Sequence, residues 1–171
     1  MMKGMIQVYT GKGKGKTTAA LGLALRAAGA GFKVFIGQFL KKGSFSELKA
    51  LERLEGMEVE QFGSGRFIGS TIRREDKQCA ARGLARIREV INSGEYDLVV
   101  LDEINVALSF NLIEEVELLE IITQRPIHVE IVLTGRNAPQ EILKQADLVT
   151  EMREIRHYYE DGVAARVGIE K

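Results

Sequence analysis

The sequence predicts an α/β fold, a three-layer sandwich in which helices cover both faces of a mostly parallel central sheet. Short apolar runs recur along the chain and alternate with segments of helical periodicity. Several of these runs are almost wholly apolar, which is typical of parallel strands buried on both faces. The chain has 171 residues and shows no Pro/Ser-rich linker and no repeat, so we expect a single domain over residues 1–171.

Strands are expected at the apolar runs, which turn-forming residues separate. The predicted strands are Met5–Tyr9, Lys33–Phe39, Met57–Phe62, Asp97–Leu101, Val129–Thr134 and Leu148–Glu151, with Arg153–His157 as a further candidate. Because the carboxyl ends of parallel strands meet at one edge of the sheet, we expect the ligand to bind at that edge.

Helical patterns fill the gaps between these strands. The first helix is expected to begin at Lys16 and to end near Ala30, where neighbouring glycines stop it. The second begins at Ser44 or Ser46, either of which can cap it, and ends near Gly56.

Three further helices are predicted in the second half of the chain. One has an apolar face that repeats every three or four residues and ends at a glycine. The face consists of Ala80, Leu84, Ile87 and Ile91, and the glycine is Gly94. The next begins at Asn111, with Glu114 three residues on as in a capping box, and ends before Pro126. The last follows Pro139.

The connection between the first strand and the first helix is rich in glycine and lysine. It reads Thr10-Gly11-Lys12-Gly13-Lys14-Gly15-Lys16-Thr17-Thr18. Glycines let the backbone turn tightly and aim N–H groups at phosphate oxygens, and the positive end of the helix dipole favours the same anion. We therefore predict a phosphate-binding loop in which Lys16 reaches the terminal phosphates and the Thr17 hydroxyl binds magnesium.

This loop is a shortened variant of the general P-loop, since Thr10 stands where the first glycine is expected and glycine follows one residue later. Lysines at positions 12, 14 and 16 carry more positive charge than a standard loop, which suits stabilisation of a whole departing triphosphate. In the alternative interpretation, Lys12 and Lys14 point to solvent and the segment is only a glycine-rich connection.

An acidic pair, Asp102 and Glu103, follows the apolar strand that ends at Leu101. Carboxylates at this place bring hard oxygen ligands toward magnesium from a strand beside the P-loop strand. Taken alone, such a pair is usually a turn or a helix cap. Downstream of a P-loop we interpret both as magnesium ligands, although in a kinase or ATPase Glu103 would orient the nucleophile.

Arg136 follows another apolar strand, so we expect it at the same edge of the sheet, where it could bind a phosphate bidentately. A surface salt bridge is the alternative. His128 begins a strand and is expected to be structural, at the opposite edge. His157 stands beside two tyrosines, and packing is its default role, with lining of a base pocket as the alternative.

Composition excludes several classes of protein. The 24 basic and 24 acidic residues give no net charge, so charge offers no argument for nucleic-acid binding. Cys79 is the single cysteine, which rules out an intramolecular disulfide or a cysteine zinc cluster and favours a reducing compartment. No apolar run is long enough to cross a bilayer. We expect a cytoplasmic location without membrane or nucleic-acid partners.

Several segments together resemble the P-loop ATP:corrinoid adenosyltransferase (cob(I)alamin adenosyltransferase) family. They are VYTGKGKGKTTAA (8–20), GQFLK (37–41), VLDE (100–103), TGRNAP (134–139), ADLVTEM (146–152) and the ending RHYYEDGVAARVGIE (156–170). The resemblance implies a P-loop NTPase-like (RecA-type) fold. It further implies transfer of the 5′-deoxyadenosyl group of ATP to the cobalt of a reduced corrinoid, with release of triphosphate. In this family, ATP lies in the loop in the reverse of the usual direction.

The resemblance also assigns roles to residues and partners. It places the loop at 11–18, with Lys16 as a catalytic residue and Thr17 as the magnesium-binding hydroxyl, and it places the magnesium carboxylate at Glu103 with Asp102 adjacent. Arg136 matches the arginine after the family's Thr-Gly pair and is assigned to phosphate and catalysis. Mg²⁺, ATP and a reduced corrinoid are the implied cofactor and cosubstrates, with a homodimer and a reductase supplying Co(I) as implied partners.

One segment departs from the family pattern. Where the family carries Gly-Phe-Thr-Trp in the loop that meets the corrinoid, this chain reads GRFIG (65–69) and has no tryptophan. We expect Phe67 to provide the apolar contact with the corrinoid. A phosphoryl-transferring kinase or NTPase, and a nucleotide- or corrinoid-binding sensor without turnover, remain the alternatives.

Overall fold

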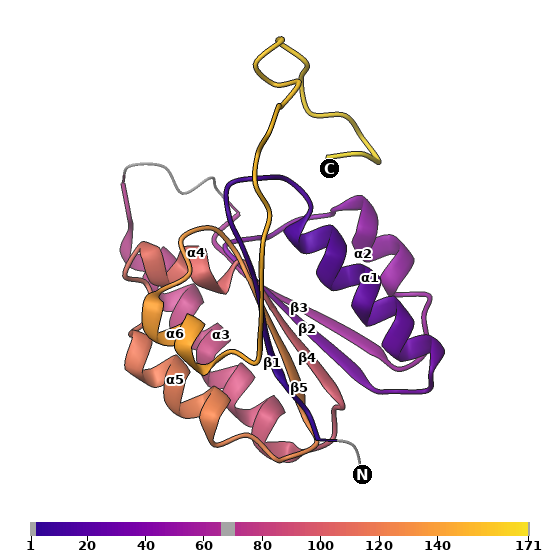
Figure 1. Ribbon diagram of the computed structural model, residues 1–171, viewed down its shortest axis with the longest axis vertical. Coiled ribbons are helices and arrows are strands. Elements are labelled where there is room, and N and C mark those ends of the chain that lie inside the picture. The colour runs from indigo at the N-terminus through magenta and orange to yellow at the C-terminus, as the bar shows by residue number, and fades with distance from the viewer. Residues whose placement is uncertain (1–2, 66–70, 171) are drawn as a thin grey trace.

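The computed structural model describes residues 3–65 and 71–170. Over this part of the chain, a six-stranded sheet lies between two layers of helices (Figure 1). The strands are β1 (Ile6–Thr10), β2 (Val34–Phe39), β3 (Met57–Phe62), β4 (Leu98–Asp102), β5 (Glu130–Thr134) and β6 (Leu148–Glu151). Their order is β3-β2-β4-β5-β1-β6, and every neighbouring pair is parallel. The predicted α/β sandwich is therefore confirmed, with a sheet that is wholly parallel.

The helices divide between the two faces of the sheet, as Figure 1 shows. They are α1 (Lys16–Gly29), α2 (Ser46–Leu51), α3 (Arg74–Ser93), α4 (Ile104–Ser109), α5 (Glu115–Thr123) and α6 (Gln140–Gln145). Helices α1 and α2 cover one face, and the other four lie on the opposite face. This arrangement leaves the carboxyl edge of the sheet open between the two layers.

The central strands are buried on both faces because their alternate side chains enter two separate apolar cores. Every residue of β4 is buried. Val99 and Leu101 pack with α3, α4 and α5, whereas Leu98 and Val100 pack with α1. Helix α1 meets the sheet through small side chains, Ala20, Ala24 and Ala27. Small residues allow close approach, so the start of α1 lies close to the strand ends.

The third predicted helix is confirmed in detail. Its predicted face, made of Ala80, Leu84, Ile87 and Ile91, is buried, and Gly94 ends the helix in a left-handed conformation with φ 64°. The last predicted helix also begins directly after Pro139. Both are cases in which periodicity and a terminating or initiating residue agree.

Several expected elements differ from the structure. Arg153–His157 forms no strand, and α4 was not predicted. Helix α2 begins after Phe45 rather than after a capping serine and ends at Leu51, well before Gly56. The capping box at Asn111 is also wrong, because Asn111 occupies a left-handed turn (φ 51°) and Glu114 precedes α5.

The expected neighbour of the P-loop strand is wrong as well. Strand β5, rather than β4, pairs with β1, so β5 lies between the loop strand and the strand that ends in Asp102. The two strand ends still share one edge of the sheet, because all of the strands run in the same direction.

After β6 the chain continues without helix or strand, and we refer to residues 152–170 as the carboxyl-terminal tail. In Figure 1 the tail rises from the carboxyl edge of the sheet, makes a loop and turns back. It passes close to the β1–α1 connection, where the N–H of Gly13 donates to the carbonyl of Met152 over 2.7 Å. The tail therefore belongs to the same edge as the predicted site.

Candidate active site

The β1–α1 connection has the backbone of a phosphate-binding loop. Gly11 and Gly15 have φ angles of 95° and 113°, which favour glycine, and Gly15 immediately precedes α1 without a side-chain cap. No side chain of Gly15 accepts a hydrogen bond from the first N–H groups of α1. These groups point toward the carboxyl edge of the sheet. Together with the positive end of the helix dipole, they can bind an anion.

Lys16 lies in the centre of this loop. Its side chain is 8% exposed, and its ammonium donates to the carbonyls of Gly11 (2.8 Å) and Gly13 (2.6 Å). Burial lowers the pKa of Lys16, and the nearby Glu103 carboxylate opposes that shift. An ammonium has three N–H donors, so one N–H of Lys16 remains available after these two bonds. The two bonds to the loop fix the direction of that N–H.

Asp102 joins four elements beneath the loop. Its Oδ1 accepts from the Thr17 hydroxyl (2.8 Å) and the Thr134 hydroxyl (2.7 Å). Its Oδ2 forms an ion pair with Lys41 (2.7 Å) and accepts from Gln38 over 3.3 Å. Asp102 is only 1% exposed, so these donors replace water around its charge.

Glu103 is turned toward the open side of the same edge. It has a left-handed backbone (φ 60°, ψ 17°) immediately before α4, and its N–H donates to Thr134 Oγ1 over 3.0 Å. A non-glycine residue in this region is strained, and such strain is often retained at functional sites. Burial, followed by the neighbouring Asp102 charge, raises the pKa of Glu103, whereas Lys41, Lys16 and Arg136 oppose the shift.

A cavity of about 710 Å³ lies over the loop. Its lining contains most of the predicted site residues and residues from both ends of the carboxyl-terminal tail. The predicted residues that line it are Lys12, Gly13, Lys14, Gly15, Lys16, Thr17, Thr18, Glu103 and Arg136. Gly11 borders an adjoining hollow, and Asp102 lies buried behind Thr17. Phe67 lies outside the described residues.

The structure also fits a divalent cation at Thr17, Asp102 and Glu103. All three provide hard oxygen donors at one edge of the sheet, as Mg²⁺ prefers. Asp102, rather than Glu103, contacts the Thr17 hydroxyl directly. In the described part of the chain, no cluster of three or more His, Cys, Asp or Glu side chains is arranged to hold a metal, so a phosphate oxygen or water would have to complete the coordination.

Some site residues were not singled out from the sequence. Lys41 and Gln38 lie at the end of β2 and reach Asp102, and Thr134 reaches it from β5. Their shared signal was a polar side chain at the end of an apolar strand. His157 lines the cavity, and its ring also packs against that of Tyr158, with the ring centroids 4.7 Å apart. His128 is structural as expected, with a ring nitrogen 3.1 Å from the carbonyl of Gly94.

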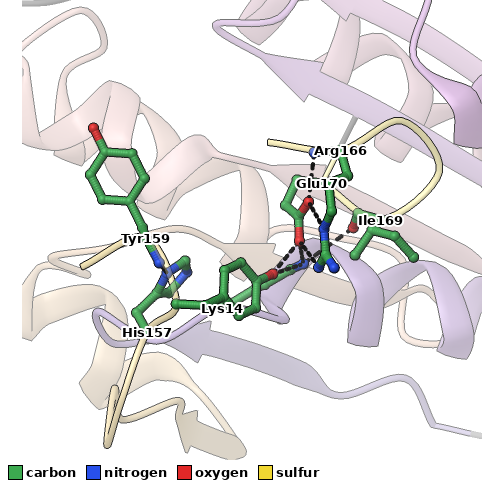
Figure 2. A network of polar contacts seen from close by, with 7 residues as sticks. Lys14, His157, Tyr159, Arg166, Ile169 and Glu170 are labelled. Carbon is green, nitrogen blue, oxygen red and sulfur yellow. Dashed lines mark hydrogen bonds and ion pairs between the residues drawn. The ribbon is translucent and has the colours of Figure 1, made fainter. Parts of the chain in front are cut away.

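Lys14 points away from the loop and toward the tail (Figure 2). Its ammonium contacts the Tyr158 hydroxyl (3.0 Å), the Glu170 carboxylate (3.0 Å) and the carbonyl of Ile169 (3.2 Å). The hydrogen bonds that Lys14 donates to Tyr158 and then to Glu170 raise the pKa of Lys14. The hydrogen bonds that Arg166 donates are the first cause that lowers the pKa of Glu170. Both groups are therefore charged near neutral pH.

The family model for ATP:corrinoid adenosyltransferases of the BtuR/CobO/CobP type matches residues 2–170. The chain belongs to this family. It is 34% identical over 169 residues to a corrinoid adenosyltransferase of Escherichia coli K12, an alignment that spans 98% of this chain and 86% of that protein. A corrinoid adenosyltransferase of a Sinorhizobium species is 36% identical over 173 residues, spanning 98% of this chain and 80% of that protein.

The fold of this adenosyltransferase family member also occurs in a solved structure. A KaiC-like protein of Pyrococcus horikoshii superposes with a TM-score of 0.57 at 17% identity, over 90% of this chain and 75% of that one. The likeness supports the P-loop NTPase-like fold and nothing about the reaction. Across the residues that the structure describes, none of the helices has the length and apolarity to cross a membrane.

Proposed function

We propose that this protein transfers the 5′-deoxyadenosyl group of ATP to the cobalt of a reduced corrinoid and releases inorganic triphosphate. The observation that supports this most strongly is the single cavity in which the glycine-lysine loop, Glu103 and Arg136 meet, in a chain of the corrinoid adenosyltransferase family. The Co–C bond forms with the electron pair of Co(I), and the broken C5′–O bond leaves its pair on triphosphate.

The geometry suits this displacement because Co(I) is already a strong nucleophile. No side chain has to remove a proton, so the protein has two tasks, to position C5′ and to stabilise the departing anion. Lys16, Arg136 and the N–H groups at the start of α1 supply positive charge on the same cavity. This charge acts most strongly on the triphosphate as it separates from the adenosyl group.

We further infer that Mg²⁺ is held by Thr17, Asp102 and Glu103. When bound, it would neutralise part of the charge of the phosphates. The Thr17 oxygen can bind the cation through a lone pair while its hydrogen still donates to Asp102. Glu103 already faces the cavity that would hold the phosphates.

The corrinoid is proposed to enter at the open side of the cavity. Phe67, which lies outside the described residues, is proposed to provide an apolar contact with it. We also propose a cytoplasmic location, a reductase that supplies Co(I), and a homodimer. The homodimer is supported by β6, an edge strand on which Leu148 and Val149 are 44% and 48% exposed. Exposed apolar side chains on an edge strand are typical of protein contacts.

The test is an incubation with ATP, Mg²⁺ and a chemically reduced corrinoid, with two simultaneous measurements. We expect the absorbance change of cobalt–carbon bond formation together with an equal amount of triphosphate. A reaction without corrinoid serves as the control and should release no phosphate species. Release of ADP and orthophosphate, or binding of both substrates without a cobalt–carbon bond, would refute the proposal.

A further inference from the structure

Two chemically different sets of residues line the cavity over the loop. The loop, Arg136 and Glu103 form a charged set that is rich in backbone N–H donors. Leu21, Phe45, His157 and Ile169 form an apolar and aromatic set. A nucleoside triphosphate is divided in the same way, since its phosphates need donors and the faces of its base need apolar contact.

The tail provides half of those apolar and aromatic contacts. His157 and Ile169, together with Gly168 and Glu170, line the cavity from residues that are far from the loop in sequence. The rest of the tail is poorly anchored, because Ile155 and Val167 are 88% and 80% exposed. Its position must therefore depend on a few specific contacts near the loop.

Lys14 supplies the central contact of that kind. Its ammonium forms hydrogen bonds with Tyr158, Ile169 and Glu170 (Figure 2). These contacts hold the tail at both ends of the segment 158–170. Glu170 also accepts from the Tyr158 hydroxyl and from Arg166, whose guanidinium lies 3.0 Å away. Only 14% of the Glu170 side chain is exposed. Its carboxylate links Tyr158 and Arg166 of the tail to Lys14 of the loop.

We propose that the tail forms the nucleoside wall of the ATP site, with Ile169 and His157 against the adenosine and with Glu170 as a positioning residue that fixes the wall to Lys14. This proposal rests on the proposed function and names a part of the same site. It gives Lys14 a role different from phosphate binding, in agreement with the direction of its side chain in Figure 2. The wall would hold the adenosyl group while triphosphate leaves.

A competing arrangement would use the same contacts in the opposite sense. If Glu170 occupied the place of a phosphate, its carboxylate would compete with ATP for Lys14. Removal of its charge would then strengthen the binding of any polyphosphate. The two arrangements are separated by comparing a ligand that has a nucleoside with one that has only the phosphates.

The experiment is calorimetric titration of the full chain with Mg²⁺-ATP and, separately, with Mg²⁺-triphosphate. The variants are Ile169→Ala, which shortens the wall but keeps the carbonyl that binds Lys14, and Glu170→Gln, which removes the charge. Glu160→Gln is the matched control, since Glu160 is an exposed carboxylate of the same tail and does not line the cavity. Circular dichroism checks that each variant is folded.

We expect both variants to weaken ATP binding by about three- to tenfold, the loss of one apolar or anchoring contact. Triphosphate binding should stay within about twofold of wild type, and Glu160→Gln should resemble wild type for both ligands. Three outcomes would overturn the proposal that the tail forms the nucleoside wall. They are equal losses of affinity for ATP and triphosphate, tighter binding of both ligands, and unchanged binding of both ligands. If wild type itself fails to bind ATP, the proposed function fails first.

Discussion

At the scale of single residues, the site is organised by side chains with buried charge. Lys16 is held by two carbonyls of its own loop, and Asp102 by donors from helix α1, from strands β2 and β5, and from Lys41 just after β2. Lys16, Thr17 and Arg136 were predictable because their signal is local, a motif or a strand end. The contact between Lys41 and Asp102 was not, since it depends on two strands that are 61 residues apart in sequence.

Lys16→Ala is expected to remove most ATP binding. The variant loses a charge-assisted contact with phosphate, worth about 1.5–3 kcal/mol, or roughly 10- to 100-fold in Kd. It also leaves the carbonyls of Gly11 and Gly13 without this donor, so a lower melting temperature should accompany the loss.

The measurement is calorimetric titration with Mg²⁺-ATP, with Lys77→Ala as the control. Lys77 is an exposed lysine on α3, outside the cavity lining, and its removal should change neither affinity nor melting temperature. If Lys16→Ala retained wild-type affinity, Lys16 would have no part in phosphate binding.

At the scale of elements, the order of strands decides which residues meet. The strands were predictable because runs such as Leu98–Leu101 are wholly apolar, and α3 because its apolar face has helical period. Helix α4 is too short, at six residues, to show a period. The position of β5 between β1 and β4 has no local signal either, since it results from how the strands pair over long distances.

Asp102→Asn should lower the stability of the protein, because Asp102 links these elements. It should also weaken the binding of Mg²⁺. An asparagine amide would place a donor against Lys41, Thr17 or Thr134, each of which donates to Asp102. Breaking a buried ion pair costs about 3–5 kcal/mol. Lys41 is 20% exposed, so we expect a smaller loss, about 1–3 kcal/mol, and a melting temperature lower by roughly 3–10 °C.

A double-mutant cycle with Lys41→Gln checks the origin of this loss. The double variant should recover part of the stability, because the lysine no longer lies unpaired beside an amide. The Mg²⁺ concentration needed for ATP binding should still rise. Additive losses would mean that the ion pair contributes nothing to stability, and an unchanged Mg²⁺ titration would remove Asp102 from the cation site.

At the scale of the whole molecule, function is concentrated at one edge of the sheet and stability is distributed over the remainder. The fold class was predictable because alternation of strands and helices is a property of the entire chain. Apart from the base-pocket alternative for His157, the contribution of the tail to the cavity was not, because residues 153–170 have no period and reach the loop through contacts distant in sequence, such as that of Glu170 with Lys14. Far from the cavity, the edge strand β3 is fastened by a different polar network.

The contribution of that network to stability can be tested by varying the pH. The Tyr96 hydroxyl donates to Glu58 of β3 over 2.5 Å, its ring meets Phe35 edge-on, and Arg86 of α3 pairs with Glu58 and Glu60. Burial, and then the hydrogen bond to Glu58, raise the pKa of Tyr96 from 10.0 to about 12. The folded protein therefore favours the neutral phenol more strongly than the unfolded chain does.

The sign of the pH dependence follows from linkage. Below pH 10 the phenol is neutral in both states and its contribution is complete, but between pH 10 and about 12 only the unfolded chain releases the proton. The free energy of unfolding of wild type should fall over this range relative to that of Tyr96→Phe, which is less stable at pH 7. Urea unfolding at intervals of pH measures both, with the exposed Tyr159→Phe as a control that follows wild type. Parallel curves for wild type and Tyr96→Phe would show that this tyrosine does not couple ionisation to the attachment of β3.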